Sequence, residues 1–184
     1  MQKCTEKARP LLWLNMNDEP VPYSKWNELK KWIPSALLLP ACIYLIANRG
    51  SYGLIDNADL VIHEAGHFFF RLFGKFIYTA GGTLMQIIIP SIIIFYFFRN
   101  MYRLGIQIGL LWLGQNLINI SVYAADAQAQ KLPLLGGNSV YHDWHYMLGE
   151  IGLLEYSAEV GYFFVGLAIV IFILMLIMPL FIPE

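Results

Sequence analysis

A run of 23 residues near the end of the chain, Val160 to Ile182, contains no charged side chain. An α-helix of that length rises roughly 34 Å, enough to cross the hydrocarbon core of a bilayer, which is about 30 Å thick. Charged residues make up only 14% of the 184-residue chain, whereas soluble domains contain about 25%. The run therefore predicts a membrane-spanning helix, and the composition predicts that most of the chain lies in the membrane with it.

Four further apolar blocks come before this run, and three of them also lack charge. The blocks are residues 32–47, 54–73, 82–98 and 104–125. Backbone polar groups inside a bilayer must be hydrogen-bonded within their own segment, which favours helices. We therefore expect an all-α fold, a polytopic integral membrane bundle with about five transmembrane helices. We expect residues 1–31 to form an N-terminal juxtamembrane segment and residues 32–184 to form the membrane-embedded domain.

The positions of the basic residues predict how the bundle is oriented. With five spans, the two ends of the chain lie on opposite sides of the membrane, and nine of the twelve Lys and Arg residues fall on the side of the N-terminus. The positive-inside rule then places the N-terminus in the cytoplasm, and we expect an integral protein of the cell (inner) membrane. The net charge of −1 gives no reason to expect nucleic acid as a partner.

One motif in the second apolar block contains residues that can bind a metal ion and transfer a proton. His63, Glu64 and His67 form an HExxH pattern. Positions i and i+4 share one face of a helix, so both imidazoles can bind one zinc ion while the glutamate between them takes a proton from water. We therefore predict that the bundle surrounds a Zn2+ cofactor, with His63 and His67 as metal ligands and Glu64 as general base and acid.

The surroundings of the motif strengthen this prediction. Residues 60–62 before it and residues 68–70 after it are all apolar. Burying two imidazoles and a carboxylate in such a segment costs several kcal/mol unless the groups are paired or ligated. The alternative is a helix that lines the bundle interior, with both imidazoles bonded to backbone carbonyls and Glu64 paired with Arg71.

A catalytic zinc ion needs a third protein ligand and keeps a fourth position open. Candidates gather in the polar stretch before the last apolar run, which contains the chain's other two histidines. His142, Asp143 and His145 lie close together there, and Asp126 precedes them. The alternative for this stretch is a hydrated loop whose histidines are simply exposed.

These features resemble the site-2 protease family of intramembrane zinc metalloproteases. In that family an HExxH helix lies within the membrane, and a later segment containing a proline brings an aspartate as the third ligand. Residues 80–86 are similar to the family's Gly-Pro-x-x-Asn element, with Thr83 in place of the proline and Gln86 in place of the asparagine. Residues 131–135 are similar to the proline-containing approach. The resemblance thus favours Asp143 as the third ligand, although Trp and not Gly follows it.

The resemblance covers roughly residues 55–148 and implies hydrolysis of peptide bonds in membrane-associated substrates, through a zinc-activated water with Glu64 as general base. The expected partners are a membrane protein or peptide substrate and the lipid bilayer. Two other functions stay open: a membrane zinc hydrolase that acts on a lipid, and a non-catalytic zinc-stabilised scaffold. Replacing Glu64 with Gln separates a scaffold from an enzyme, because only the enzyme needs that carboxylate.

Overall fold

The computed structural model describes residues 25–132 and 142–182, and every regular element in these two ranges is helical. This confirms the predicted all-α class for the described residues. The helices are α1 (Lys25–Lys30), α2 (Ile33–Ala47), α3 (Leu54–Phe70), α4 (Lys75–Arg99), α5 (Arg103–Ala125), α6 (Asp143–Glu150) and α7 (Ser157–Ile177), with short 3-10 helices η2 (Leu154–Tyr156) and η3 (Met178–Leu180) at the two ends of α7. Most of the predicted juxtamembrane segment, residues 1–24, lies outside the described residues.

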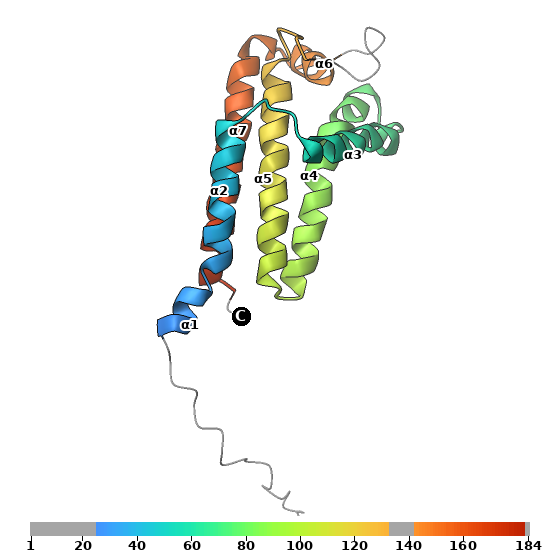
Figure 1. Cartoon of the computed structure of the whole chain (residues 1–184). Coiled ribbons are helices and arrows are strands. Elements are labelled where there is room, and N and C mark those ends of the chain that lie inside the picture. The colour runs from blue at the N-terminus through green and yellow to red at the C-terminus, as the bar shows by residue number, and fades with distance from the viewer. Residues whose placement is uncertain (1–24, 133–141, 183–184) are drawn as a thin grey trace, which may run out of the picture.

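Four helices stand side by side along one direction: α2, α4, α5 and α7 (Figure 1). The chain runs up α2, down α4, up α5 and down α7, so α1 and the end of α7 lie at the same end of the bundle. At this end the Ser35 hydroxyl donates to the carbonyl of Leu176 at 2.9 Å. At the opposite end Nε of Arg49 donates to the hydroxyl of Ser121 at 2.9 Å. Hydrogen bonds therefore tie α2 to its neighbours at both of its ends.

The same four helices are long and apolar enough to cross a membrane. The candidate spans are Glu28–Ala47, Lys75–Arg99, Arg103–Ala125 and Leu154–Leu180. Many large apolar side chains along these spans are exposed, and large exposed apolar surfaces mark contact with a membrane or a partner. The described structure therefore supports a helical membrane protein.

The sequence predicts α3 as a further span, but this helix is placed differently. It runs crosswise to the upright helices and packs beside α4 (Figure 1), and its 17 residues are not among the candidate spans. The physical reason is its composition, because Asp56, Asp59 and Glu64 interrupt the apolar pattern that a span requires. Four crossings put the two described ends of the chain on one side of the membrane, whereas five crossings put them on opposite sides.

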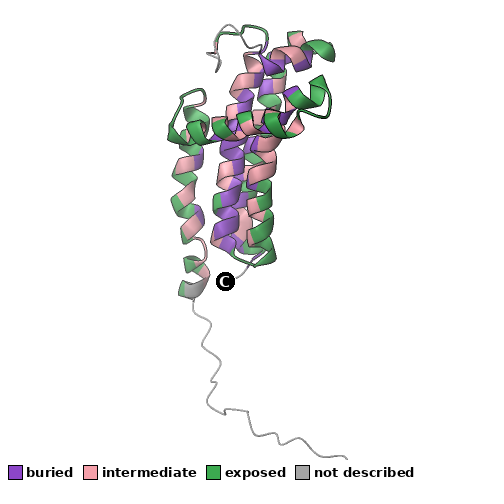
Figure 2. Cartoon of the chain, turned by 90° about the vertical axis from the view of Figure 1, so that its right-hand side faces the viewer, coloured by how far each residue is buried: buried purple, intermediate pink, exposed green. Residues whose placement is uncertain are grey.

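The core of the bundle forms around α5, where buried residues are concentrated (Figure 2). Glycines let this helix approach its neighbours closely. A Cβ at Gly114 would overlap the ring of Phe172 on α7, and a Cβ at Gly109 would lie 2.7 Å from a side-chain carbon of Ile94 on α4. Inside a bilayer, close packing at small residues stabilises helix pairs because lipid tails remove most of the hydrophobic driving force.

The inward face of α3 is polar, which is the reverse of an amphipathic helix in a soluble protein. Its buried positions are Asp59, His63 and Gly66, whereas Val61 and Phe68 on other faces are exposed. Lipid tails accommodate apolar side chains and not ionisable ones, so a helix in a membrane protein turns its polar face toward the protein interior. This face carries part of the HExxH motif into the bundle, against α4 and α5.

Candidate metal centre

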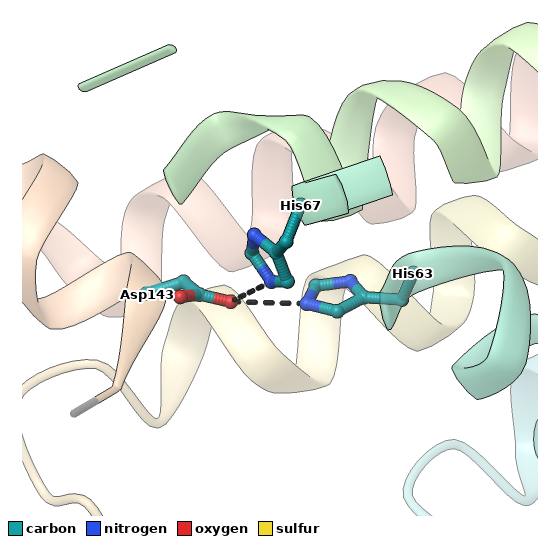
Figure 3. A group of neighbouring side chains, drawn as sticks. All are labelled: His63, His67 and Asp143. Atoms are coloured by element: carbon teal, nitrogen blue, oxygen red, sulfur yellow. Dashed lines mark hydrogen bonds and ion pairs between the residues drawn. The ribbon is translucent and has the colours of Figure 1, made fainter. Parts of the chain in front are cut away.

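Three potential metal ligands from two distant parts of the chain meet at one point (Figure 3). Nε2 of His63 lies 3.0 Å from Oδ2 of Asp143, and Nε2 of His67 lies 3.2 Å from the same oxygen. The three ligand atoms lie within 4.8 Å of one another, and no other such group of His, Cys, Asp or Glu occurs among the described residues. The structure therefore brings together the two histidines and the aspartate that the sequence predicts as ligands.

The other nitrogen of each imidazole faces an acceptor. Nδ1 of His67 lies 2.9 Å from the carbonyl oxygen of Tyr78, and Nδ1 of His63 lies 3.1 Å from Oε1 of Gln86. Because a backbone carbonyl only accepts hydrogen bonds, Nδ1 of His67 carries a proton and donates it, and Nδ1 of His63 donates likewise to the oxygen that the amide of Gln86 presents here. In a neutral imidazole this leaves the lone pair of Nε2 pointing toward Asp143, which is the tautomer that zinc-binding histidines adopt when Nδ1 is hydrogen-bonded.

The donor set fits a zinc ion. Two imidazole lone pairs that face one carboxylate oxygen repel it unless a positive charge lies among them, and a metal ion or an added imidazole proton supplies that charge. Ligand atoms about 2.0–2.2 Å from a tetrahedral zinc ion lie roughly 3.3 Å apart. The separations of the two imidazole nitrogens from Oδ2 of Asp143, 3.0 and 3.2 Å, are close to this value, and all three ligand atoms lie within 4.8 Å of one another. Two histidines and one carboxylate, with a fourth position left open, form a known catalytic zinc set.

Asp143 is held in place by α6 and α5. It is the first residue of α6, where the side chain of His142 caps the helix by accepting from the backbone N–H of His145 at 3.3 Å. The backbone N–H of Asp143 donates to the hydroxyl of Tyr123 on α5 at 3.2 Å. Burial by itself raises the pKa of the Asp143 carboxyl, but hydrogen bonds donated by the two imidazoles in their protonated form, and the positive charge they then carry, outweigh burial and hold the pKa below its usual range. Either these protons or a metal ion therefore balance the negative charge of the carboxylate.

Glycines at the crossing of α3 and α4 allow the imidazole of His63 to lie close to its hydrogen-bond acceptor, the side-chain oxygen of Gln86. A Cβ at Gly66 would overlap the carbonyl of Gly81, and a Cβ at Gly82 would overlap the imidazole of His63. The hydropathy pattern begins an apolar block at Gly82, but α4 begins earlier, at Lys75, so both of its glycines lie inside the helix. Their missing side chains allow the two backbones to lie this close.

Glu64 lies beside the ligands but outside their contacts. Its side chain is exposed and lines the same cavity as His63 and His67. Within the part of the chain that the structure describes, no hydrogen bond or ion pair engages it. The alternative pairing with Arg71 is not observed, since that guanidinium lies over the ring of Phe68, 4.6 Å from the ring centroid. The carboxylate of Glu64 is thus free to face water or a substrate.

The other three candidates for the third ligand, Asp126, His142 and His145, have different interaction partners. Nε2 of His142 lies 3.4 Å from Oδ2 of Asp126, and Asp126 also accepts two hydrogen bonds from backbone N–H groups. Nδ1 of His145 lies 2.9 Å from the carbonyl oxygen of Ala127. His142 is only 1% exposed and Asp143 only 9% exposed, so the alternative of an exposed, hydrated loop is wrong for these two residues.

The sequence does not predict the three groups that orient the ligands, which are the side chain of Gln86, the carbonyl of Tyr78 and the hydroxyl of Tyr123. In the sequence, Gln86 stands in place of the asparagine of the Gly-Pro-x-x-Asn element, whereas in the structure it is 5% exposed and faces an imidazole. The carbonyl of Tyr78 leaves no mark in a sequence, because every residue has one. The hydroxyl of Tyr123 has no spacing relation to Asp143 that could have signalled it. The predicted proline-containing approach, residues 131–135, lies outside the described residues after position 132.

A cavity of about 1020 Å³ opens beside the ligands. It reaches from Asp143 and His67 along α3, past Leu60, to Asp56, and residues of α2, α4 and α5 complete its wall. Glu64 lines the cavity next to the ligands. The cavity therefore leaves space beside the ligands and beside the carboxylate of Glu64.

Comparison of the chain with protein-family models, with curated proteins and with solved structures finds no match in any of the three. The case for a function therefore rests on the geometry of the site and on the chemistry of its residues.

Proposed function

We propose that this protein is a membrane-embedded zinc metallopeptidase that hydrolyses peptide bonds of membrane-associated substrates. The observation that carries the proposal is the position of Asp143, whose Oδ2 lies within 3.2 Å of Nε2 of both HExxH histidines. A five-residue HExxH pattern occurs by chance in many chains. A carboxylate 80 residues after His63 that faces both imidazoles through tertiary folding is a much more specific arrangement.

Each residue of the site has a role in this proposal. His63, His67 and Asp143 would hold the zinc ion and leave one position open. When bound, the ion polarises the carbonyl of the scissile bond and lowers the pKa of water toward neutrality. Glu64 takes a proton from the attacking water and returns it to the leaving amine.

The groups behind the ligands keep them oriented for this chemistry. The carbonyl of Tyr78 and the amide oxygen of Gln86 each hold an Nδ1 proton, which fixes the tautomer and strengthens the imidazole as a ligand. The hydroxyl of Tyr123 holds the backbone of Asp143 from the α5 side. These contacts support a site that is already arranged before a metal ion or a substrate arrives.

We place the N-terminus and the described end of α7 in the cytoplasm, with the metal centre toward the opposite surface. With four spans, and with the segment before residue 25 counted together with α1, eight of the twelve Lys and Arg residues lie on the side of the chain ends. The positive-inside rule supports this orientation. α3 and α6, which carry the ligands, lie at the end of the bundle away from α1 (Figure 1).

The resemblance to site-2 proteases supports a membrane-associated protein or peptide as the substrate. A helix in a bilayer has its backbone carbonyls engaged in hydrogen bonds, so a substrate must unwind before its peptide bond can be attacked. The cavity along α3 lies beside the ligands and has room for a short extended segment.

A comparison of the wild type with Glu64→Gln tests the proposal. Both proteins, purified in detergent and loaded with zinc, are expected to hold about one ion per chain, because Glu64 is not a ligand in this proposal. The wild type is expected to cleave peptides from a synthetic apolar pool, and the variant to lose roughly 100-fold or more of that rate. Cleavage is measured by mass spectrometry of the products.

Other outcomes favour the competing functions. Wild type that binds no zinc contradicts the proposal. Zinc-dependent hydrolysis of phospholipid or lipid-amide vesicles, without any peptide product, indicates a lipid hydrolase. A Glu64→Gln variant that keeps the biological activity of the wild type indicates a scaffold.

A further inference from the structure

The cavity beside the metal centre is acidic. Among the described residues that line it there are three carboxylates, and none of the lining residues is Lys or Arg. The three carboxylates belong to Asp56, Glu64 and Asp143. A bound divalent ion offsets two of their charges and leaves one net negative charge in the cavity. The end of the cavity that is distant from the ligands therefore attracts cations.

Asp56 occupies that distant end at a distance that the helix sets. It lies on α3 seven residues before His63, and both residues line the one cavity. Seven residues of α-helix rise roughly 10.5 Å and return the side chain to nearly the same face. The two histidine ligands lie 7 and 11 residues after Asp56, so a substrate held between them has the carboxylate of Asp56 roughly 10–16 Å from its reacting bond.

The carboxylate of Asp56 is oriented but not neutralised. Its Oδ1 accepts from the amides of Gln115 at 2.8 Å and Asn119 at 2.9 Å, and its Oδ2 accepts from the backbone N–H of Gly53 at 2.6 Å. All three donors are uncharged, so they fix the direction of the carboxylate and leave its charge. Within residues 25–132 and 142–182, no Lys, Arg or His forms an ion pair with it.

A second carboxyl group belongs to a buried residue of α3, where burial raises the pKa and disfavours the charged form. Asp59, one turn along α3, is fully buried and accepts at Oδ1 from Trp112 at 2.9 Å and from Asn116 at 3.2 Å. Its Oδ2 is buried and has no hydrogen-bond partner among the described residues. Asp59 does not line the cavity. When it is ionised, its charge still acts on the nearby cavity wall, because the low dielectric of a membrane protein interior screens it weakly.

We propose that Asp56 is a specificity determinant that binds a positively charged side chain of the substrate, Lys or Arg, about three to five residues from the scissile peptide bond. An extended chain advances about 3.3–3.6 Å per residue, so three to five residues span the roughly 10–16 Å between the two points. Tyr52, whose hydroxyl donates to the carbonyl of Asp56 at 3.2 Å, lines the same cavity and offers an aromatic ring to the cation. This inference rests on the proposed peptidase function and adds the class of its substrate.

The test uses the full-length, zinc-loaded protein in detergent and a set of synthetic apolar peptides of one sequence. Each peptide carries one Lys, Gln or Glu at a single position, scanned across both sides of the cleaved bond, and product is measured by mass spectrometry. At one position about three to five residues from the cut, we expect Lys to be preferred over Glu by roughly tenfold or more, since a hydrogen-bonded charge pair has about that effect. Asp56→Asn is expected to abolish the preference, and Asp56→Arg to reverse it.

Asp59→Asn is the matched control. It changes a carboxyl group on the same helix that accepts hydrogen bonds from Trp112 and Asn116 of α5, but this group does not line the cavity. It is expected to keep the preference for Lys, and zinc content reports whether each variant is folded. Equal relative rates for Lys, Gln and Glu in the wild type overturn this inference and leave the peptidase function standing. A preference for Lys that survives in Asp56→Asn and Asp56→Arg also overturns it. Failure of the zinc-loaded wild type to cleave any peptide overturns the proposed function and this inference together.

Discussion

Gly66 of α3 and Gly81 of α4 lie backbone against backbone. A Cβ on Gly66 would overlap the carbonyl of Gly81, and a Cβ on Gly81 would lie 2.8 Å from the carbonyl oxygen of Gly66. The imidazole of His67 on α3 and the carbonyl of Tyr78 on α4 flank this crossing. The distance between the metal ligands and the groups that orient them therefore depends on two residues without side chains.

Gly66→Ala is expected to separate α3 from α4 and to abolish zinc binding. The added methyl group meets backbone atoms of Gly81, which cannot rotate away as a side chain can. Overpacking of this kind costs about 1–3 kcal/mol or more. Zinc content and thermal unfolding of the detergent-solubilised variant measure the effect. Gly166→Ala on α7 is the control, because a Cβ there meets nothing within 4 Å. A Gly66→Ala protein with normal zinc content contradicts the close crossing.

Gln86→Leu is expected to weaken zinc binding without removing a ligand. The substitution keeps the approximate size of the side chain but takes away the oxygen that faces Nδ1 of His63. Loss of such a partner typically lowers metal affinity about 10–100-fold. Competition with a zinc chelator gives the dissociation constant. Ser91→Ala, one turn further along α4 and bonded only to its own helix, should leave that constant unchanged. Equal affinities in all three proteins would show that Gln86 does not orient the ligand.

Asp143→Ala and His145→Ala are expected to behave differently although the two residues are neighbours in sequence. The carboxylate of Asp143 faces both imidazoles, whereas the ring of His145 faces the carbonyl of Ala127. Elemental analysis should find zinc lost in the first variant and retained in the second. The reverse result would make His145 the third ligand and would require α6 to rotate from its position in this structure.

Zinc is expected to stabilise the wild type and to leave His67→Ala unaffected. A ligand that binds only the folded state at a hundredfold excess over its dissociation constant stabilises that state by about 2.7 kcal/mol. The midpoint of thermal unfolding should therefore rise on zinc addition and fall again with a chelator. An equal rise in His67→Ala would place the stabilising ion at a site other than the one formed with His63 and Asp143.

The sequence predicts the features that depend on local periodicity and composition. Long stretches without charge predict helices that span a membrane, and four helices that are long and apolar enough to do so are present in the described residues. The i, i+4 spacing of His63 and His67 predicts that both imidazoles share one helix face, because 3.6 residues make a turn wherever a helix forms. The ionisable side chains of α3 likewise predict that one face of this helix turns inward. None of these features requires knowledge of a distant residue.

Only the tertiary structure decides which features meet. α3 lies across the bundle and not along it, because the polar groups of its inner face find partners on α4 and α5. Asp143, and not its rivals, faces the histidines because the packing of α6 beside Tyr123 aims that one side chain at them. A sequence records which groups could bind a metal ion. The choice among them depends on contacts between segments up to 80 residues apart, which no local pattern encodes.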